Sequence, residues 1–144
     1  MKVENTADRI GDDIVAKIYL NLGIISTSSN LHQQALYQHE KSLEHKLRSL
    51  NGNMNHESIM SQFVLLAHSA SKINQEDEAC CFLEKALTIC RILHGDFTET
   101  TAYSMMQLAT AYQSAFRAQD AINILEHAGM ILSKLEGQRN TLTG

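Results

Sequence analysis

Seven histidines and three cysteines are the residues of this 144-residue chain whose chemistry could bind a metal ion. His32, His39 and His45 fall in one predicted helix together with Glu40 and Glu44. The three histidines are seven and six residues apart, so no two of them lie side by side as an i,i+4 pair does. We interpret them as solvated side chains of a helix face, with His39 as a candidate half-buried polar residue between helical hairpins.

The cysteines suggest a zinc site only weakly. Cys90 and His94 are four residues apart on a predicted helix. Cys80 and Cys81, however, point about 100° apart on a helix, and the glycine-bearing knuckles of structural zinc sites are missing. Because adjacent cysteines rarely bridge each other and their number is odd, we expect reduced thiols, with Cys90 filling the core. The sequence therefore predicts no metal.

Catalytic signatures are also missing. The sequence has no Gly-rich phosphate loop, no Gly-x-Ser-x-Gly turn and no kinase or nucleotide motif. No nucleophile beside a general base can be read from it. We expect a protein without enzymatic activity, catalytic residues or cofactors.

Composition and charge narrow the class of partner. The net charge of −4 and the pI of about 5.9 argue against nucleic acid or an anionic membrane, because both need a basic face. The segment Met1 to Asp13 is polar and acidic, and no stretch approaches the ~20 apolar residues of a membrane span. The absence of proline favours a helical stack. We expect a cytoplasmic protein that inserts into no membrane.

A repeated pattern organises the whole chain. A leucine followed by a small residue recurs, and an alanine follows at a fixed distance. The three copies are Leu22-Gly23 with Ala35, Leu66-Ala67 with Ala79, and Leu108-Ala109 with Ala121. Successive copies are 44 and 42 residues apart, and Leu-x-Gly, ending at Gly52, Gly95 and Gly137, keeps the same period. A fixed period of this length indicates a repeat protein, which usually presents a surface and does no chemistry.

Each repeat has apolar residues at helical spacing, broken once in the middle, so that each predicted helix has one inner apolar stripe. The first helices of the repeats carry Leu22, Leu66 and Leu108 on this stripe, and the last helix carries Ala121, Leu125, Ala128 and Leu132. The pattern predicts six helices over residues 8–28, 31–50, 56–72, 75–94, 98–115 and 118–136. Asn30 and Asn74 are placed to cap the helices that follow them. Gly52, Gly95 and Gly137 stand where a helix ends in a left-handed residue.

The pattern resembles the tetratricopeptide repeat. The matching residues are the Leu-Gly/Ala pair, the small or aromatic residue three positions later (Ser26, Ala70, Tyr112) and the alanine of the second helix. The period exceeds the usual ~34 residues and is similar to the long variety of kinesin light chains, as is the segment Glu84 to Gly95. The resemblance implies an all-α, right-handed superhelix (α-solenoid) of three antiparallel helical hairpins. We expect a single domain, 1–144, with repeats at about 8–52, 53–95 and 96–137 and a frayed tail at 138–144.

The turn inside each hairpin departs from the family pattern. Its usual glycine is replaced by Asn30, Asn74 and Phe116. Asparagine tolerates a left-handed backbone, whereas a phenylalanine does so poorly. We expect the third turn to differ, with Phe116 tucked against the stack or offered to a partner.

The resemblance also implies a binding site, because the first helix of each hairpin lines the concave side of the stack. A non-catalytic scaffold or adaptor would bind a peptide or helix of a partner protein there. The expected partner-binding residues are Leu20, Asn21, Ile24, Val64, Leu65, His68, Lys72, Tyr103, Met106, Gln107 and Thr110. A carboxylate clamp is disfavoured, because only Lys17, Asn21 and Lys72 could contribute to it. Alternatively, apolar groove residues such as Val64 and Leu65 simply pack against neighbouring helices.

Two further readings stay open. The helix at 118–136 carries Ile122, Ile124, Ile131 and Leu135 beyond its inner stripe, so the chain could be a self-assembling element that forms a homo-oligomer through its terminal repeats. It could equally be a piece of a longer array. The segment Ala86 to Glu99 resembles the helical repeats at the C-terminus of proteins that pair SET and MYND domains, where catalysis would lie outside this chain.

Overall fold

A computed structural model describes residues 6–143 of the chain. The described residues form six α-helices joined by short turns: α1 (Thr6–Ser28), α2 (His32–Ser49), α3 (Glu57–Lys72), α4 (Glu76–His94), α5 (Glu99–Ser114) and α6 (Ala118–Thr143). The all-α prediction is confirmed. Every predicted boundary lies within two residues of the observed one, except the end of the last helix.

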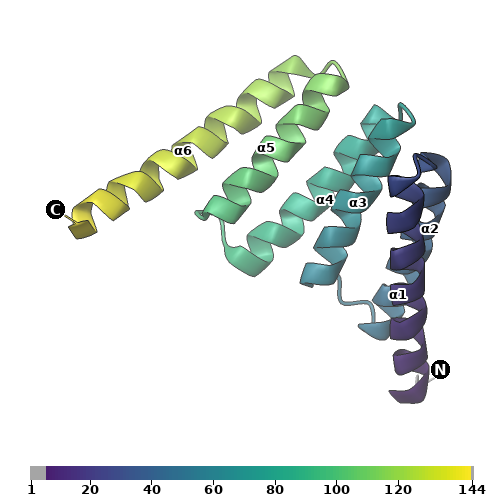
Figure 1. The fold of residues 1–144 in the computed structure, drawn as a ribbon. Coiled ribbons are helices and arrows are strands. Elements are labelled where there is room, and N and C mark those ends of the chain that lie inside the picture. The colour runs from purple at the N-terminus through teal and green to yellow at the C-terminus, as the bar shows by residue number, and fades with distance from the viewer. Residues whose placement is uncertain (1–5, 144) are drawn as a thin grey trace.

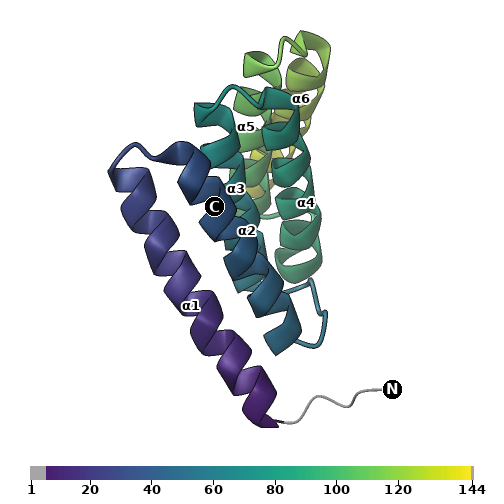
Figure 2. The ribbon, with the colours of Figure 1, turned by 90° about the vertical axis from the view of Figure 1, so that its right-hand side faces the viewer.

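The helices are arranged as three consecutive hairpins, α1/α2, α3/α4 and α5/α6. Figure 1 shows the hairpins following one another, so that the two ends of the chain lie at opposite sides of the molecule. Within the stack, α2 packs against α3 and α4 packs against α5. Figure 2 views the stack from the α1/α2 end and shows α1 on its outside. The second helix of each hairpin therefore joins it to the next hairpin.

The turn inside each hairpin has one geometry. Asn30, Asn74 and Phe116 all adopt a left-handed backbone, with φ of 60°, 63° and 60°. The closing hydrogen bonds run from Leu31 N to Ser26 O (2.8 Å), from Gln75 N to Ala70 O (2.9 Å) and from Arg117 N to Tyr112 O (2.8 Å). This is the Schellman pattern that ends a helix. The prediction that the third turn would differ was wrong, and the Phe116 side chain is 96% exposed, so it is not tucked against the stack.

The predicted capping role of Asn30 and Asn74 was also wrong. Both residues end the first helix of their hairpin, and the next residues, Leu31 and Gln75, precede the second helix without a side-chain cap. Asparagine serves here because its short polar side chain tolerates a positive φ. Because Asn30 and Asn74 occupy the left-handed position that ends the first helix, the residue after each of them takes the N-cap position of the second helix.

The loops between hairpins follow the prediction more closely. Gly52 and Gly95 have positive φ values of 77° and 92°, which glycine adopts at little cost. The helices that follow are capped by side chains, because His56 accepts a hydrogen bond from Ser58 N and Thr98 accepts one from Thr101 N. Each hairpin therefore begins at a defined residue.

The last helix is longer than predicted. Gly137 lies inside α6, which continues to Thr143, so the helix end predicted at 136 is not found. Two contacts support the extension: Arg139 Nη2 donates to Glu99 Oε1 at 2.6 Å, and Thr141 Oγ1 donates to Gly137 O at 2.9 Å. Residue 144 lies outside the described residues.

The core runs along the inner faces of α3, α4 and α5. The alanines of the repeat pattern are buried as predicted, on α2 to α6, and so are Leu66 (0% exposed) and Leu108 (2%). Leu22 of the first copy is 40% exposed, against expectation, as are Leu125 (47%) and Leu132 (40%), which were placed on an inner stripe. The helices α1 and α6 each pack against their own hairpin partner but lack a neighbouring hairpin on the other side.

Two other residues differ from expectation. Ile131 was predicted to lie outside the inner stripe of its helix, but it is fully buried. His39 was expected to be half-buried, and its exposed fraction is 0%. No helix in the described part of the chain has the length and apolar character needed to cross a membrane.

Candidate functional site

Two hollows open on the face built by α1, α3 and α5, one on each side of α3. The α3–α5 hollow has a volume of about 380 Å³ and is lined by Met60, Ser61, Val64, Leu65, Cys90, Thr100, Tyr103, Ser104 and Gln107. The α1–α3 hollow has a volume of about 410 Å³ and is lined by Ala16, Lys17, Leu20, Ile24, Ser42, Lys46, Ser58, Ser61, Gln62 and Leu65. Ser61 and Leu65 line both, so α3 forms the wall between them.

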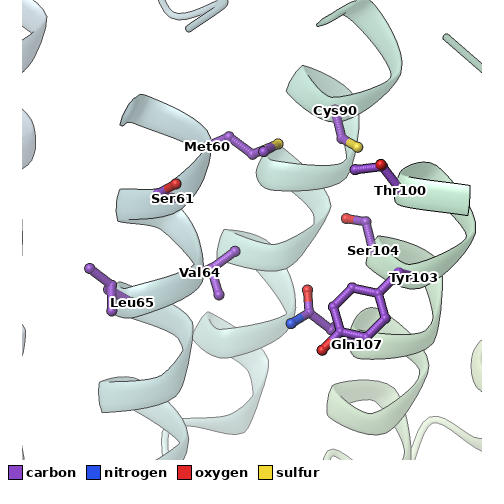
Figure 3. A pocket seen from close by; sticks show the side chains of 9 residues that line it. All are labelled: Met60, Ser61, Val64, Leu65, Cys90, Thr100, Tyr103, Ser104 and Gln107. Atoms are coloured by element: carbon purple, nitrogen blue, oxygen red, sulfur yellow. The ribbon is translucent and has the colours of Figure 1, made fainter. Parts of the chain in front are cut away.

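Side-chain size explains why the α3–α5 hollow stays open. The helices α3 and α5 both pack against α4, which holds them apart, and small side chains face the gap between them. Figure 3 shows Met60 and Val64 of α3 on the side that faces α5, while Leu65 points to the other side of the helix. Ser104 and Cys90 are too small to close the space. The result is a mainly apolar socket with a few hydroxyl and amide groups on its α5 wall.

The two hollows are formed by the same positions of successive repeats. The residues that line the α1–α3 hollow can be compared with their equivalents one repeat later. Adding 44 to the residue numbers on α1 and α2, and 42 to those on α3, gives most of the residues that line the α3–α5 hollow. The corresponding pairs are Ala16/Met60, Lys17/Ser61, Leu20/Val64, Lys46/Cys90, Ser58/Thr100, Ser61/Tyr103, Gln62/Ser104 and Leu65/Gln107. A surface with two equivalent hollows one repeat apart therefore follows from the fold.

The α1–α3 hollow contains a fixed chain of buried polar groups. Ser42 Oγ donates to Ala16 O at 2.8 Å, and Gln62 Nε2 donates to Ser42 Oγ. The remaining polar atom, Gln62 Oε1, is buried without a hydrogen-bond partner. Gln62 Oε1 is therefore an acceptor at this hollow that no donor of the described residues satisfies.

Lysines of the α1–α3 hollow are already paired. Asp13 Oδ1 lies 2.7 Å from Lys46 Nζ, and Asp13 Oδ2 lies 3.2 Å from Lys17 Nζ. The hydrogen bonds from Lys46 and then Lys17 lower the pKa of the Asp13 carboxyl below its usual value. A carboxylate ligand would have to compete with Asp13 for both ammonium groups, which disfavours a carboxylate clamp here.

Most of the residues predicted for partner binding are brought together. Leu20 and Ile24 line the α1–α3 hollow, Val64, Tyr103 and Gln107 line the α3–α5 hollow, and Leu65 lines both. A smaller hollow of about 200 Å³ between α3 and α5 is lined in part by Val64, His68, Gln107 and Thr110.

Three predicted residues lie elsewhere. Asn21 and Met106 are exposed and line none of these hollows, although each lies next to a lining residue on its helix. Lys72 lines a separate, open depression with His32 and Tyr37, beside the first hairpin turn.

Sequence reasoning missed the residues one turn earlier on the same helices. Met60, Ser61, Thr100 and Ser104 precede the predicted positions by three or four residues and lie on the same helical face. The helical period could have found them. The floor of each socket, Cys90 or Lys46, comes from the second helix of a hairpin and carried no such signal.

Two other titratable side chains, Cys80 and Tyr112, have raised pKa values. In the described residues no group of three or more His, Cys, Asp or Glu side chains is placed to hold a metal ion. The three cysteines are free thiols, and burial raises the pKa of the Cys80 thiol, which keeps it protonated. Burial, with a hydrogen bond to Glu84, raises the pKa of Tyr112 to about 12. The site offers apolar contact and hydrogen bonding.

Comparisons with known proteins agree with this geometry. Residues 60–128 match the family model of the tetratricopeptide repeat. A crystal structure of BtubC (BKLC) from P. vanneervenii superposes with a TM-score of 0.74 at 24% identity, over 87% of this chain and 49% of that chain. This chain thus spans about half the length of that protein, and the likeness concerns the fold. A comparison with curated proteins gave no match.

Proposed function

We propose that this chain, which is a tetratricopeptide repeat protein, binds a peptide or helix of a partner protein on the face of α1, α3 and α5. Tetratricopeptide repeats mediate protein–protein interaction, and the proposal assigns that role to one face. The pair of equivalent hollows on either side of α3 carries the proposal. We also propose that the chain acts by binding and has no catalytic role.

The size and lining of the hollows favour apolar anchors. Volumes of about 380 and 410 Å³ lie in the range of small-ligand pockets. Leu20, Val64 and Leu65 offer aliphatic contact, and Gln107 offers both a donor and an acceptor to a peptide backbone. A partner segment that places one apolar side chain in each hollow would cover Leu65, which stands between them.

The test is a selection of binding peptides from a random library, followed by affinity measurement on two variants. Leu65→Glu puts a charge in the wall of both hollows, and we expect the affinity to fall at least tenfold, about 1.4 kcal/mol. The matched control is Ile92→Glu on α4, an exposed aliphatic residue that lines neither hollow. Asn21→Ala combined with Gln107→Ala should also weaken binding while stability stays nearly unchanged. Equal affinity of Leu65→Glu and the unaltered chain would contradict the proposal.

A second candidate function is end-to-end self-association. The outer face of α1 exposes an aliphatic stripe at helical spacing, made of Ile10, Ile14, Ile18, Leu22 and Ile25. The outer face of α6 exposes Ile122, Leu125, Met130 and Leu132. In the interior of the stack, the corresponding contact joins a second helix to the next first helix, so α6 of one copy could pack on α1 of another.

Sedimentation velocity over a range of concentrations tests this candidate. We expect the mass to rise with concentration, and Ile14→Glu with Ile18→Glu to abolish the rise. Ile92→Glu is again the control. A constant monomer mass would reject self-association and leave the peptide-binding proposal intact.

A further inference from the structure

Three histidines from two repeats meet at the junction of the first and second hairpins. His32 and His39 come from α2, and His68 comes from α3. The rings of His32 and His68 are 6.3 Å apart between centroids and stand edge to face, at 74°. His39 has no exposed surface. No spacing in the sequence joins His68 to the other two, because it lies in a different repeat.

The imidazole of His39 has no hydrogen-bond partner. Both Nδ1 and Nε2 are buried and unpaired, and His32 Nδ1 is unpaired as well. A neutral imidazole carries one donor and one acceptor, whereas a protonated one carries two donors and a positive charge. Protonation would therefore place an unpaired charge in the interior, where it is costly.

The fold makes room for this ring at a specific place. A Cβ atom added to Gly23 would lie 2.5 Å from His39 Cε1. One repeat later, the equivalent residues are Ala67 and Leu83, an ordinary aliphatic contact in the core. The first repeat thus has Gly23 and His39 at the positions where the second repeat has Ala67 and Leu83. The pair puts a titratable group where the second repeat has an inert one.

The groups around His39 offer no compensating negative charge. The titratable group that acts on His39 is His68 of α3, which in turn lies near Lys72 and, on α2, His32. From α1 the ring meets Gly23, while the α1 carboxylates Asp12 and Asp13 pair with other residues of α2. On α2 itself, Glu40 is exposed.

Burial, and then the charge of His68, lower the pKa of His39. Burial, Lys72 and His32 lower the pKa of His68. Acid therefore adds only positive charge to this junction.

We propose that His39, with His68 across the junction, forms an acid-sensitive latch whose protonation loosens the first hairpin from the rest of the stack. The latch goes beyond peptide binding and needs no ligand. Loosening α1 and α2 would also remove one wall of the α1–α3 hollow, so acid would release any ligand bound there; this last consequence rests on the proposed function.

The pH range follows from the direction of the pKa shifts. Above the unfolded pKa of about 6.5 both states are neutral, and the junction has its full stability. Below about 6.5 the unfolded hairpin binds protons that the folded hairpin does not. The folding equilibrium of the hairpin then falls about tenfold per pH unit for each shifted histidine, until the lowered pKa is reached.

Hydrogen exchange on the complete chain tests the latch. Amide protection, corrected for intrinsic exchange, is compared between pH 7.5 and 5.5 for α1 and α2 against α5 and α6. We expect protection of α1 and α2 to fall about tenfold if His39 acts alone and up to about a hundredfold if His68 acts with it. Equal protection at the two pH values, or the same loss in α5 and α6, would overturn the proposal.

The matched variant restores the core of the second repeat. Gly23→Ala with His39→Leu should reduce the acid-induced loss to the part due to His68, whereas His127→Leu on α6 should leave it unchanged. An undiminished loss in the double variant would overturn the proposal. If the double variant does not fold, NMR titration of the unaltered chain decides: the His39 ring should titrate below pH 6.5, in step with the loss of protection, and titration at or above 6.5 would refute the latch.

Discussion

Gly23→Ala is the substitution for which the structure makes the sharpest prediction. Alanine is a better helix former than glycine by about 1 kcal/mol, so a mid-helix Gly→Ala change normally stabilises a helix. At Gly23, however, the new Cβ would lie 2.5 Å from His39 Cε1 and 2.7 Å from its Nδ1. Real Cβ atoms do not approach other atoms so closely, and overpacking of this kind costs about 1–3 kcal/mol. We expect a net loss of about 1 kcal/mol.

Gly129 provides an internal control for the same substitution. It also lies inside a helix, and a Cβ added to it would meet nothing within 4 Å. Gly129→Ala should therefore raise the free energy of unfolding by about 1 kcal/mol. Urea unfolding followed by far-ultraviolet circular dichroism measures both variants, and we expect them to differ by about 2 kcal/mol, with opposite signs.

Rescue by His39→Leu identifies the clash. With the imidazole removed, Gly23→Ala should recover most of the lost stability, because alanine and leucine already pack together at Ala67 and Leu83. If Gly23→Ala and Gly129→Ala change the stability by the same amount, the His39 ring does not occupy the space beside Gly23. The argument for a latch would then fail with it.

Two other residues give independent predictions. Phe116→Asn should raise the free energy of unfolding by about 1 kcal/mol, because asparagine tolerates a positive φ better than phenylalanine does. Phe116 is 96% exposed and has a φ of 60°, and the same position in the other two turns is occupied by Asn30 and Asn74. An unchanged or lower stability would show that the phenylalanine side chain makes a stabilising contact. Tyr112, which donates to Glu84 at 2.9 Å, has a pKa raised to about 12, so the folded state keeps a proton that the unfolded state loses above pH 10. Its stabilising effect should be present below pH 10 and lost between pH 10 and about 12; in Tyr112→Phe this loss should be absent, as alkaline unfolding curves would show.

Periodicity was sufficient to predict the helices, because buried positions recur with the repeat wherever a helix has neighbours on both sides. Leu66 and Leu108 are buried for this reason. The same pattern misplaced Leu22 and Leu125, since a helix at the edge of the stack has the residue type of the core without the neighbour that would cover it. Turn chemistry was harder still, because Asn30 is compatible both with a cap and with a left-handed helix end.

The hollowed face of α1, α3 and α5 could be predicted only in outline. Repeat position identified Leu20, Val64 and Leu65, because the first helix of every hairpin lines the same face. Repeat position could not show that small side chains leave two separate hollows, because the depth of a hollow depends on the size of the side chain on the facing helix. The meeting of His39 with His68 was equally hidden, because it depends on how two hairpins are packed and on no spacing within one of them.

The same comparison between repeats explains how the two hollows come to differ. Each is made of equivalent positions, so the fold fixes their outlines and leaves their chemistry to single residues. Lys46 at the floor of one corresponds to Cys90 in the other, and buried Gln62 corresponds to Ser104. The first hollow therefore has an ion-paired lysine and an unpaired acceptor, while the second has a thiol and a hydroxyl at the equivalent positions. A ligand spanning both would meet unlike environments at its two anchors, and this difference is what would fix the direction in which it binds.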